Sequence, residues 1–289
     1  MKTIYKVGLS IIILTAVILS LYLPICRCVG NSISDAKFKK YFNNDNNVMM
    51  YFYLKAHPEY IIYPVSTGNR TLLHAAVLKN KEKIVKLLVS EGAYINVLDD
   101  KHMTPLLYAI KNKKYKIIDS LANTNTMNFY NDGFTPLYYA LSKNDYDIVK
   151  YLIDKGADVK VKDTYGDNCL QHYLSFIENF VGYPKYEIIY RKHNSKIFDL
   201  LIESGADINN INKLKQSVLM TAIHQINSEA VNQLLTSNVD IFYKDPSGET
   251  ALYYAIFYVN TYDEIDNKKD ERENIVRILK NAIKKKKSS

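Results

Sequence analysis

Histidine and cysteine are the side chains of this 289-residue chain best suited to metal binding or nucleophilic catalysis. None of the histidines forms a His-Glu-x-x-His pair, and none lies beside a cysteine at the spacing of zinc ligands. The six histidines are His57, His74, His102, His172, His193 and His224. Three cysteines are too few for a disulfide framework, and Cys169 is expected to be a small core residue. The sequence also lacks a Gly-x-Gly-x-x-Gly motif, a Walker loop and a Gly-x-Ser-x-Gly motif. We therefore expect no catalytic residue, no metal site and no cofactor, and we predict that the protein is not an enzyme.

Other side chains recur at fixed distances from a short motif, Thr135-Pro136-Leu137-Tyr138-Tyr139-Ala140. Clear copies begin at Thr71, Thr104 and Thr250, and weaker copies begin at Asn168 and Ser217. The steps between first residues are 33, 31, 33, 49 and 33. Three tyrosines lie four residues after the first motif residue, namely Tyr108, Tyr139 and Tyr254, and are expected to pack as a stripe. A fixed period of this length predicts an array of one supersecondary unit.

Each unit carries local signals for two helices. Thr is a good N-cap, and Pro after it has no N–H to lose and a φ already suited to a helix. An apolar run at helical spacing follows, as at 148–153, and ends at glycine in Gly92, Gly156 and Gly205. Glycine suits the left-handed residue that ends a helix. The unit is thus predicted to be a turn, a short helix, a second turn, a second helix and an extended hairpin arm.

The motif and its period resemble the ankyrin repeat, whose signature is Thr-Pro-Leu-His-x-Ala. The resemblance covers about residues 69–281 and implies an all-α solenoid of about six stacked helix-turn-helix repeats with short β-hairpin arms. It suggests a bacterial-type member with an N-terminal signal or anchor. It also implies that His74 bonds back to the turn. Asp99, Asp163 and Asp245, each five residues before a motif, would brace the hairpins and so are not acid–base pairs.

The predicted repeats occupy residues 67–283, at about 67–98, 99–129, 130–162, 163–211, 212–244 and 245–283. Repeat two lacks the glycine stop and is two residues short, so its hairpin is expected to be tighter or irregular. Repeat four has 16 extra residues (49 minus 33) between its helices. Repeats four and five lack Thr, Pro and His together, which leaves their hairpin geometry open. In repeat five, Asn238 stands where glycine is expected.

Residues outside the array are predicted to form a cap, a basic tail and a targeting segment. Residues 31–66 would cap the array and bury apolar side chains such as Phe52, Leu54 and Ile61, and residues 284–289 would be a solubilising tail. Residues 1–30 combine Lys2 and Lys6 with an uncharged run at 7–26, which is long enough to span a bilayer. A cleaved signal peptide, a retained membrane anchor and lipidation at Cys26 all remain open, and basic residues on both flanks leave the orientation ambiguous. Export to the cell envelope, membrane-anchored or periplasmic, is the favoured expectation.

The expected function is binding of a protein partner on the concave face of the array. The family's variable positions pick out many aromatic and aliphatic side chains, the types that dominate interface energetics. These positions are Lys101, Met103, Phe129, Phe134, Lys162, Tyr165, Phe176, Ile211, Leu214, His224, Lys244, Phe257 and Tyr258. The net charge of +8 is not clustered as in a nucleic-acid binder, so we expect no nucleic-acid partner, membrane contact only through residues 1–30, and a monomer. A secreted host-directed effector and an enzyme with an unrecognised site in the repeat-four insertion are the alternatives.

Overall fold

The computed structural model describes residues 36–62, 64–66, 68–130, 135–175, 193–261 and 268–288. The predicted targeting segment at 1–30 and the repeat-four insertion lie outside these residues. Within the described ranges, no helix is long and apolar enough to cross a membrane. The chain divides into two compact units, residues 1–122 and 123–289, and each is described by itself.

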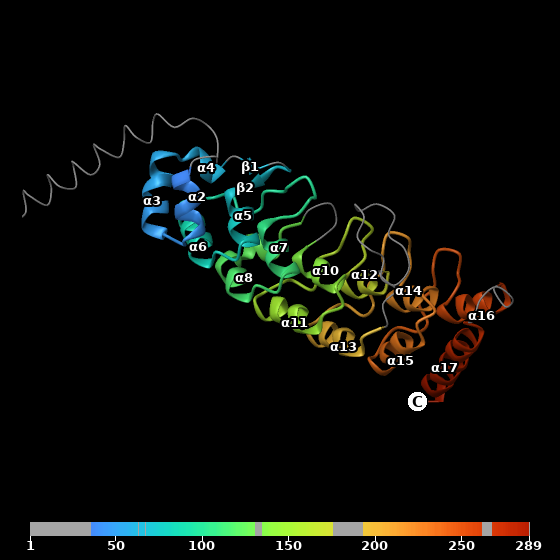
Figure 1. The fold of residues 1–289 in the computed structure, drawn as a ribbon. Coiled ribbons are helices and arrows are strands. Elements are labelled where there is room, and N and C mark those ends of the chain that lie inside the picture. The colour runs from blue at the N-terminus through green and yellow to red at the C-terminus, as the bar shows by residue number, and fades with distance from the viewer. Residues whose placement is uncertain are drawn as a thin grey trace, which may run out of the picture. The chain divides into compact units, whose positions relative to one another are not determined.

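The first unit contains a helical cap, a small hairpin and two helix pairs (Figure 1). The cap consists of α2 (Ala36–Asn43), α3 (Asn47–Ala56) and α4 (Glu59–Ile62). Antiparallel strands β1 (Pro64–Ser66) and β2 (Arg70–Thr71) follow. The pairs are α5 (Leu72–Leu78) with α6 (Glu82–Ser90), and α7 (Pro105–Lys111) with α8 (Tyr115–Leu121). Helix α5 contacts α7, and α6 contacts both α8 and α3, so the cap and the pairs stack in order.

The second unit begins with the short helix α9 (Thr124–Met127) and continues as four helix pairs. They are α10 (Pro136–Leu141) with α11 (Tyr146–Asp154), α12 (Cys169–Ser175) with α13 (Ser195–Glu203), α14 (Val218–His224) with α15 (Ser228–Thr236), and α16 (Ala251–Thr261) with α17 (Lys269–Ser288). Figure 1 shows the first helices of these pairs in one row and the second helices in another. Each row is continuous, because α10, α12, α14 and α16 contact one another in turn, and so do α11, α13, α15 and α17.

Each first helix begins at its motif residue, as the sequence predicts. The Oγ1 atoms of Thr104 and Thr135 accept hydrogen bonds of 3.2 Å from main-chain N–H groups three residues later. Thr71 and His74 form a reciprocal capping box. Ser217 caps α14, and Asn168 caps α12 through two 3.1 Å bonds to its Oδ1. Serine and asparagine therefore cap the first helix in the two weak copies of the motif, as threonine does in the clear copies.

The cores of the pairs lie where the motif leucines point. Leu73, Leu106, Leu137, Leu170 and Leu219 are all buried. Gly92, Gly156 and Gly205 adopt positive φ after the second helices, and Asn238 does so at φ 48° in repeat five. These helix stops confirm the predicted units, and residues 69–281 contain six helix pairs among the residues that the structure describes.

The structure tests three local predictions, and it confirms two of them and contradicts the third. In repeat two, α8 ends at Leu121 and the chain enters α9 instead of a glycine stop, so the predicted irregularity is confirmed. In the cap, Leu54 and Ile61 are buried as expected. The expected burial of Phe52 is wrong, since this side chain is 52% exposed on the surface of α3.

Candidate protein-binding surface

Four hairpin arms are held by an acidic or amide side chain five residues before the motif. The Oδ1 atom of Asp163 accepts hydrogen bonds from the N–H groups of Tyr165 (2.8 Å) and Asp167 (2.9 Å). Asp99 and Asp245 bind the equivalent N–H groups of their own hairpins. Asn212 does so in repeat five, through one 2.9 Å bond from Gln216 N–H. The brace implied for the three aspartates is therefore confirmed, and Asn212 is a fourth member that the sequence analysis missed.

The second carboxylate oxygen of the brace binds the side chain four residues after the motif begins. Tyr108 donates to Asp99 over 2.6 Å, and Tyr254 donates to Asp245 in the same way. Burial alone would raise the pKa of Asp99, but hydrogen bonds from Tyr108 and from main-chain N–H groups outweigh it and lower that pKa. The bond from Tyr254 lowers the pKa of Asp245 and raises that of Tyr254 to about 12. These tyrosines thus fasten the hairpin to the helix and are more than a packed stripe.

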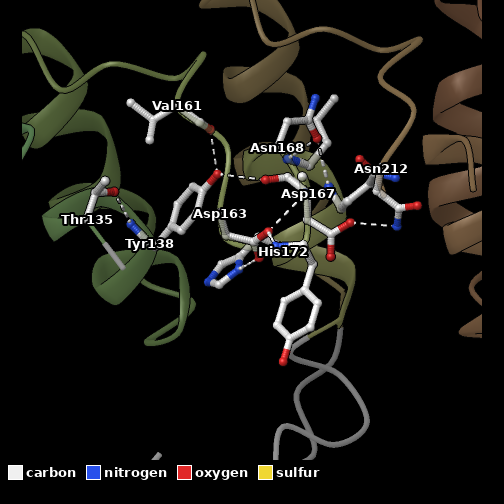
Figure 2. Close-up of polar contacts among 12 residues, drawn as sticks. Thr135, Tyr138, Val161, Asp163, Asp167, Asn168, His172 and Asn212 are labelled. Carbon is white, nitrogen blue, oxygen red and sulfur yellow. Dashed lines mark hydrogen bonds and ion pairs between the residues drawn. The ribbon is translucent and has the colours of Figure 1, made fainter. Parts of the chain in front are cut away.

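A second set of side chains links three of the repeats to the next one. The Nε2 atom of His74 lies 3.0 Å from the carbonyl oxygen of Met103, the last residue before the next motif. Gln171 donates from Nε2 to the carbonyl oxygen of Gln216 over 3.0 Å at the equivalent place. The hydroxyl of Tyr138 lies 3.1 Å from the carbonyl oxygen of Asp167 and 2.6 Å from that of Val161, and shares its hydrogen between them (Figure 2). Three residue types therefore make this link between repeats, and the sequence analysis predicted none of the three links. The predicted bond of His74 back to its own turn is confirmed separately, because its Nδ1 accepts from the main-chain N–H of Thr71 over 3.2 Å.

A buried polar network lies beneath the hairpins of repeats four and five (Figure 2). Asn212 donates from Nδ2 to Oδ1 of Asp167 over 2.8 Å, and Asn168 donates to the carbonyl of Asp207 over 2.6 Å. Asn210 donates to Oε1 of Gln171. Burial raises the pKa of Asp167 to about 6, although the bond from Asn212 opposes the shift. Buried hydrogen bonds of this kind favour one geometry of the two hairpins.

The tips of these two hairpins lie side by side. The N–H of Lys213 donates to the carbonyl oxygen of Tyr165 over 2.8 Å. Next to this bond, Gly166 has φ +77°, and a Cβ at that position would lie 3.2 Å from Lys213 N. The tips expose two large apolar side chains, Tyr165 at 48% and Leu214 at 69%. Two hydrogen-bonded hairpin tips thus present an aromatic and an aliphatic side chain to solvent.

The other predicted partner-binding residues divide into several groups. His224 and Tyr258 meet on neighbouring helices, where Nδ1 and the hydroxyl oxygen are 2.6 Å apart. Lys101, Lys162, Lys244 and Phe257 are exposed, while Phe129 and Ile211 are half-buried. Lys101 belongs to the first unit and the others to the second. Phe134 and Phe176 lie outside the described residues.

The prediction that Met103 is an exposed contact residue is wrong, because its side chain is only 3% exposed. Asp99 holds its N–H and His74 contacts its carbonyl oxygen, so the backbone is fixed with the side chain directed inward. Tyr130 and Phe242 are exposed apolar residues that the sequence analysis did not select. Both flank hairpin arms, at positions that the variable-position rule does not include.

Three side chains of types used in catalysis, Asp163, Cys169 and His172, are buried away from solvent. His172 and Asp163 lie 3.4 Å apart, but both side chains are 3% exposed, and burial lowers the pKa of His172. Cys169 is fully buried as expected, and burial raises the pKa of its thiol to about 12. Among the described residues, no group of histidine, cysteine and acidic side chains could hold a metal ion.

Comparisons with known proteins agree with this architecture. The family model of ankyrin repeats matches residues 33–122, 72–163 and 187–287. An ankyrin repeat protein of variola virus is 26% identical over 75% of this chain, and a putative ankyrin repeat protein of Acanthamoeba polyphaga mimivirus is 28% identical over 70%. A putative palmitoyltransferase of Danio rerio is 27% identical over 65%. The chain spans 37%, 28% and 27% of the lengths of these three relatives.

A solved structure supports the same fold. The ankyrin repeat domain of Bcl-3, a member of the IκB protein family, matches 86% of this chain and 99% of its own with a TM-score of 0.60. At 20% sequence identity this likeness shows the fold alone. The family model, by contrast, covers well over half of the chain. The chain therefore belongs to the ankyrin repeat family.

Proposed function

We propose that this ankyrin repeat protein is a non-catalytic adaptor that binds a protein partner through the hairpin tips of repeats four and five. Ankyrin repeats are modules of protein–protein interaction. The observation that carries the proposal is the exposure of Tyr165 and Leu214 on two neighbouring tips that the Lys213–Tyr165 main-chain bond joins. Exposed apolar side chains on a rigid backbone lose little conformational entropy on binding, and aromatic anchors dominate interface energetics.

The buried network beneath the tips supports this choice of surface. Asp163 and Asn212 fix the two hairpin backbones, and Asp167 joins them through its bond from Asn212. A preorganised surface binds more tightly than one that must be ordered by its partner. Lys162 and Lys213 are exposed near the pair, so the rim of the surface is cationic. A partner with an apolar centre and acidic residues around it fits this surface.

The proposal places the protein at the cell envelope, sent or held there by residues 1–30. The support is the sequence alone: two lysines, an uncharged run at 7–26 and a small residue at Gly30. A secreted effector acting on a host protein is the second candidate, and the same leader supports it if it is cleaved. An alkaline phosphatase reporter fused after residue 60 tests the export step, because the enzyme is active only once translocated.

Site-specific photocrosslinking tests the binding surface. A photoreactive amino acid is placed at position 165 or 214 of the full chain in cells. Position 52 is the control, because Phe52 has an exposure similar to that of Tyr165 but lies on the cap helix α3. We expect one crosslinked protein species from positions 165 and 214 and none of that species from position 52. Equal crosslinking from all three positions would contradict the proposed surface.

Affinity measurements with the identified partner then test the energetic contribution. Tyr165→Ser and Leu214→Ser are each expected to weaken binding at least about tenfold, the equivalent of about 1.4 kcal/mol. Phe52→Ser is the matched control and should bind normally. All three side chains are about half exposed or more, so the melting temperatures should change little. Normal binding by both hairpin variants would exclude this surface.

A further inference from the structure

The far end of the second unit exposes a face that the preceding repeats bury. Six residues after the first motif residue, Val77, Ile110, Leu141, Leu174 and Ile223 are each at most 2% exposed. Ile256 holds this position in α16 and is 37% exposed. Leu252, at the position of the buried motif leucines, is also partly exposed. The last described helix pair thus carries stacking residues with no repeat stacked on them in the described part of the chain.

The exposed residues of α16 form one continuous apolar face. Tyr253, Ile256 and Phe257 are three or four residues apart and lie on the same side of the helix. The rings of Tyr253 and Phe257 stack with centroids 6.4 Å apart. Leu252 joins this face, because it lies one helical turn before Ile256. Array ends normally have a polar outer face that keeps them soluble. The outer face of this described helix pair is apolar instead, as binding sites commonly are.

A cationic groove continues the apolar face onto α17. The groove has a volume of about 360 Å³ and is lined by Leu252, Lys280, Ile283, Lys284, Lys287 and Ser288. Leu252 and Ile283 supply apolar side chains, and the three lysines supply positive charge. Residues 274–288 contain no carboxylate, so α17 does not neutralise these lysines within its own last turns. The occupant must therefore bring both apolar surface and negative charge.

We propose that this end face, comprising Leu252, Tyr253, Ile256 and Phe257 with the lysine groove of α17, binds an acidic amphipathic helix of a partner protein. The shape argues for a helix, because the same positions in the preceding repeats pack against the next helix pair. The charge argues against a second copy of this chain: two identical end faces would bring Lys280, Lys284 and Lys287 of both copies together. This surface is separate from the hairpin tips and does not rest on them.

Three synthetic helices of about 20 residues provide the probe. They share one row of leucines and carry glutamate, glutamine or lysine on the remaining surface. The full 289-residue chain is captured on a sensor through its N-terminus. We expect the glutamate helix to bind at least about tenfold more tightly than the other two, and the difference to shrink at high salt. Equal affinity for all three helices would overturn the proposal.

Two matched pairs of variants locate the binding. Ile256→Ser should weaken binding of the glutamate helix, whereas Leu78→Ser should not, since Leu78 is 38% exposed on α5 of the first unit. Lys284→Glu should weaken the glutamate helix and strengthen the lysine helix, whereas Lys196→Glu, at an exposed site on α13, should do neither. Circular dichroism checks that each variant remains folded.

Two further measurements test the other occupants. Sedimentation of the chain that shows self-association abolished by Ile256→Ser would assign the face to a second copy and overturn the proposal. Vesicles of phosphatidylserine and phosphatidylcholine test a membrane surface. Vesicle binding that is lost in Ile256→Ser, with no preference for the glutamate helix, would assign the face to anionic lipid and likewise overturn the proposal. The proposal is supported if Ile256→Ser and Lys284→Glu lose the preference for the glutamate helix while Leu78→Ser and Lys196→Glu keep it.

Discussion

The hydroxyl of Tyr138 contacts the carbonyl oxygen of Asp167 in the same way that the ring of His74 contacts that of Met103. Both side chains lie three residues after the first motif residue, and both carbonyls belong to the last residue before the next motif. The relation joins consecutive repeats through one side chain. It explains how a tyrosine can replace the motif histidine without loss of stacking.

Removing this hydroxyl should destabilise the second unit. Tyr138→Phe keeps the ring packed against His172 and removes the hydroxyl donor from the carbonyl oxygens of Val161 and Asp167. The carbonyl oxygen of Asp167 keeps its bond from the N–H of Asp163. We expect the free energy of unfolding to fall by about 1–3 kcal/mol, because the bond is buried. Tyr94→Phe, at a 60% exposed site, is the control and should change nothing measurable. Urea unfolding measures both, and equal values for the two variants would contradict the assigned role.

A strained turn residue offers a stabilising substitution. Ile226 has φ 50° in the turn between α14 and α15, where a β-branched side chain is unfavourable. Asn144 takes the equivalent position between α10 and α11 with φ 52°. Ile226→Asn should raise the free energy of unfolding by about 1 kcal/mol. Asn144→Ile should lower it by more than that, because it also removes the Oδ1 atom that accepts from the Tyr173 hydroxyl over 2.7 Å. Thermal melts of the two variants show whether each stability change has the expected direction. A lower stability of Ile226→Asn than of the parent would contradict the strain assigned to Ile226.

The buried carboxyl of Asp167 should make stability depend on pH. Its folded pKa of about 6 lies above the value for an unfolded chain, so the folded state binds the proton more tightly. Its contribution to stability is therefore most favourable below about pH 4 and is lost as the pH rises through 6. Asp167→Asn keeps an acceptor for Asn212 and removes the buried charge. We expect this variant to exceed the parent by about 2–3 kcal/mol at pH 7.

Measuring the difference between variant and parent isolates Asp167. His74 and His172 have pKa values lowered by burial, so their contributions are complete above pH 6.5 and are lost as the pH falls below it. This opposing trend is the same in both proteins and cancels. The difference in the free energy of unfolding between Asp167→Asn and the parent should become smaller from pH 7 to pH 5. A constant gap would show that Asp167 does not titrate in this range.

Alanine substitutions at two glycines distinguish the cost of backbone strain from the cost of a close contact between neighbouring hairpins. Gly156 has φ +92°, and a Cβ added there would meet no other atom. Gly156→Ala should therefore lower the free energy of unfolding by about 1–2 kcal/mol, from backbone strain alone. Gly166→Ala adds a contact of 3.2 Å with the main-chain nitrogen of Lys213, which cannot move freely. We expect it to cost more and to weaken binding at Tyr165 and Leu214 by separating the tips. Equal stability losses and normal binding would contradict the close approach.

The sequence predicts the helix pairs well because their signals are local. Thr104 and Thr135 act as caps within their own first turn, and Gly156 ends its own helix. The role of Gln171 was not predictable, since its partner Gln216 lies 45 residues away and an insertion intervenes. Met103 was assigned to the surface from its position alone, while its backbone is held by Asp99 of its own hairpin and by His74 of the preceding repeat, which leaves the side chain buried. Local chemistry thus specifies the repeats, and the surface depends on how neighbouring repeats meet.

The linking side chains also predict which helix pair opens most readily by local unfolding. His74, Tyr138 and Gln171 each bond to the following hairpin, but the equivalent residue in repeat five is Met220, whose thioether has no hydrogen to donate. One hydrogen bond of about 1 kcal/mol changes an opening equilibrium about fivefold. The last helix pair should therefore separate from the second unit before the others do. Amide protons of α16 and α17 should exchange with deuterated water sooner than those of α10 to α15.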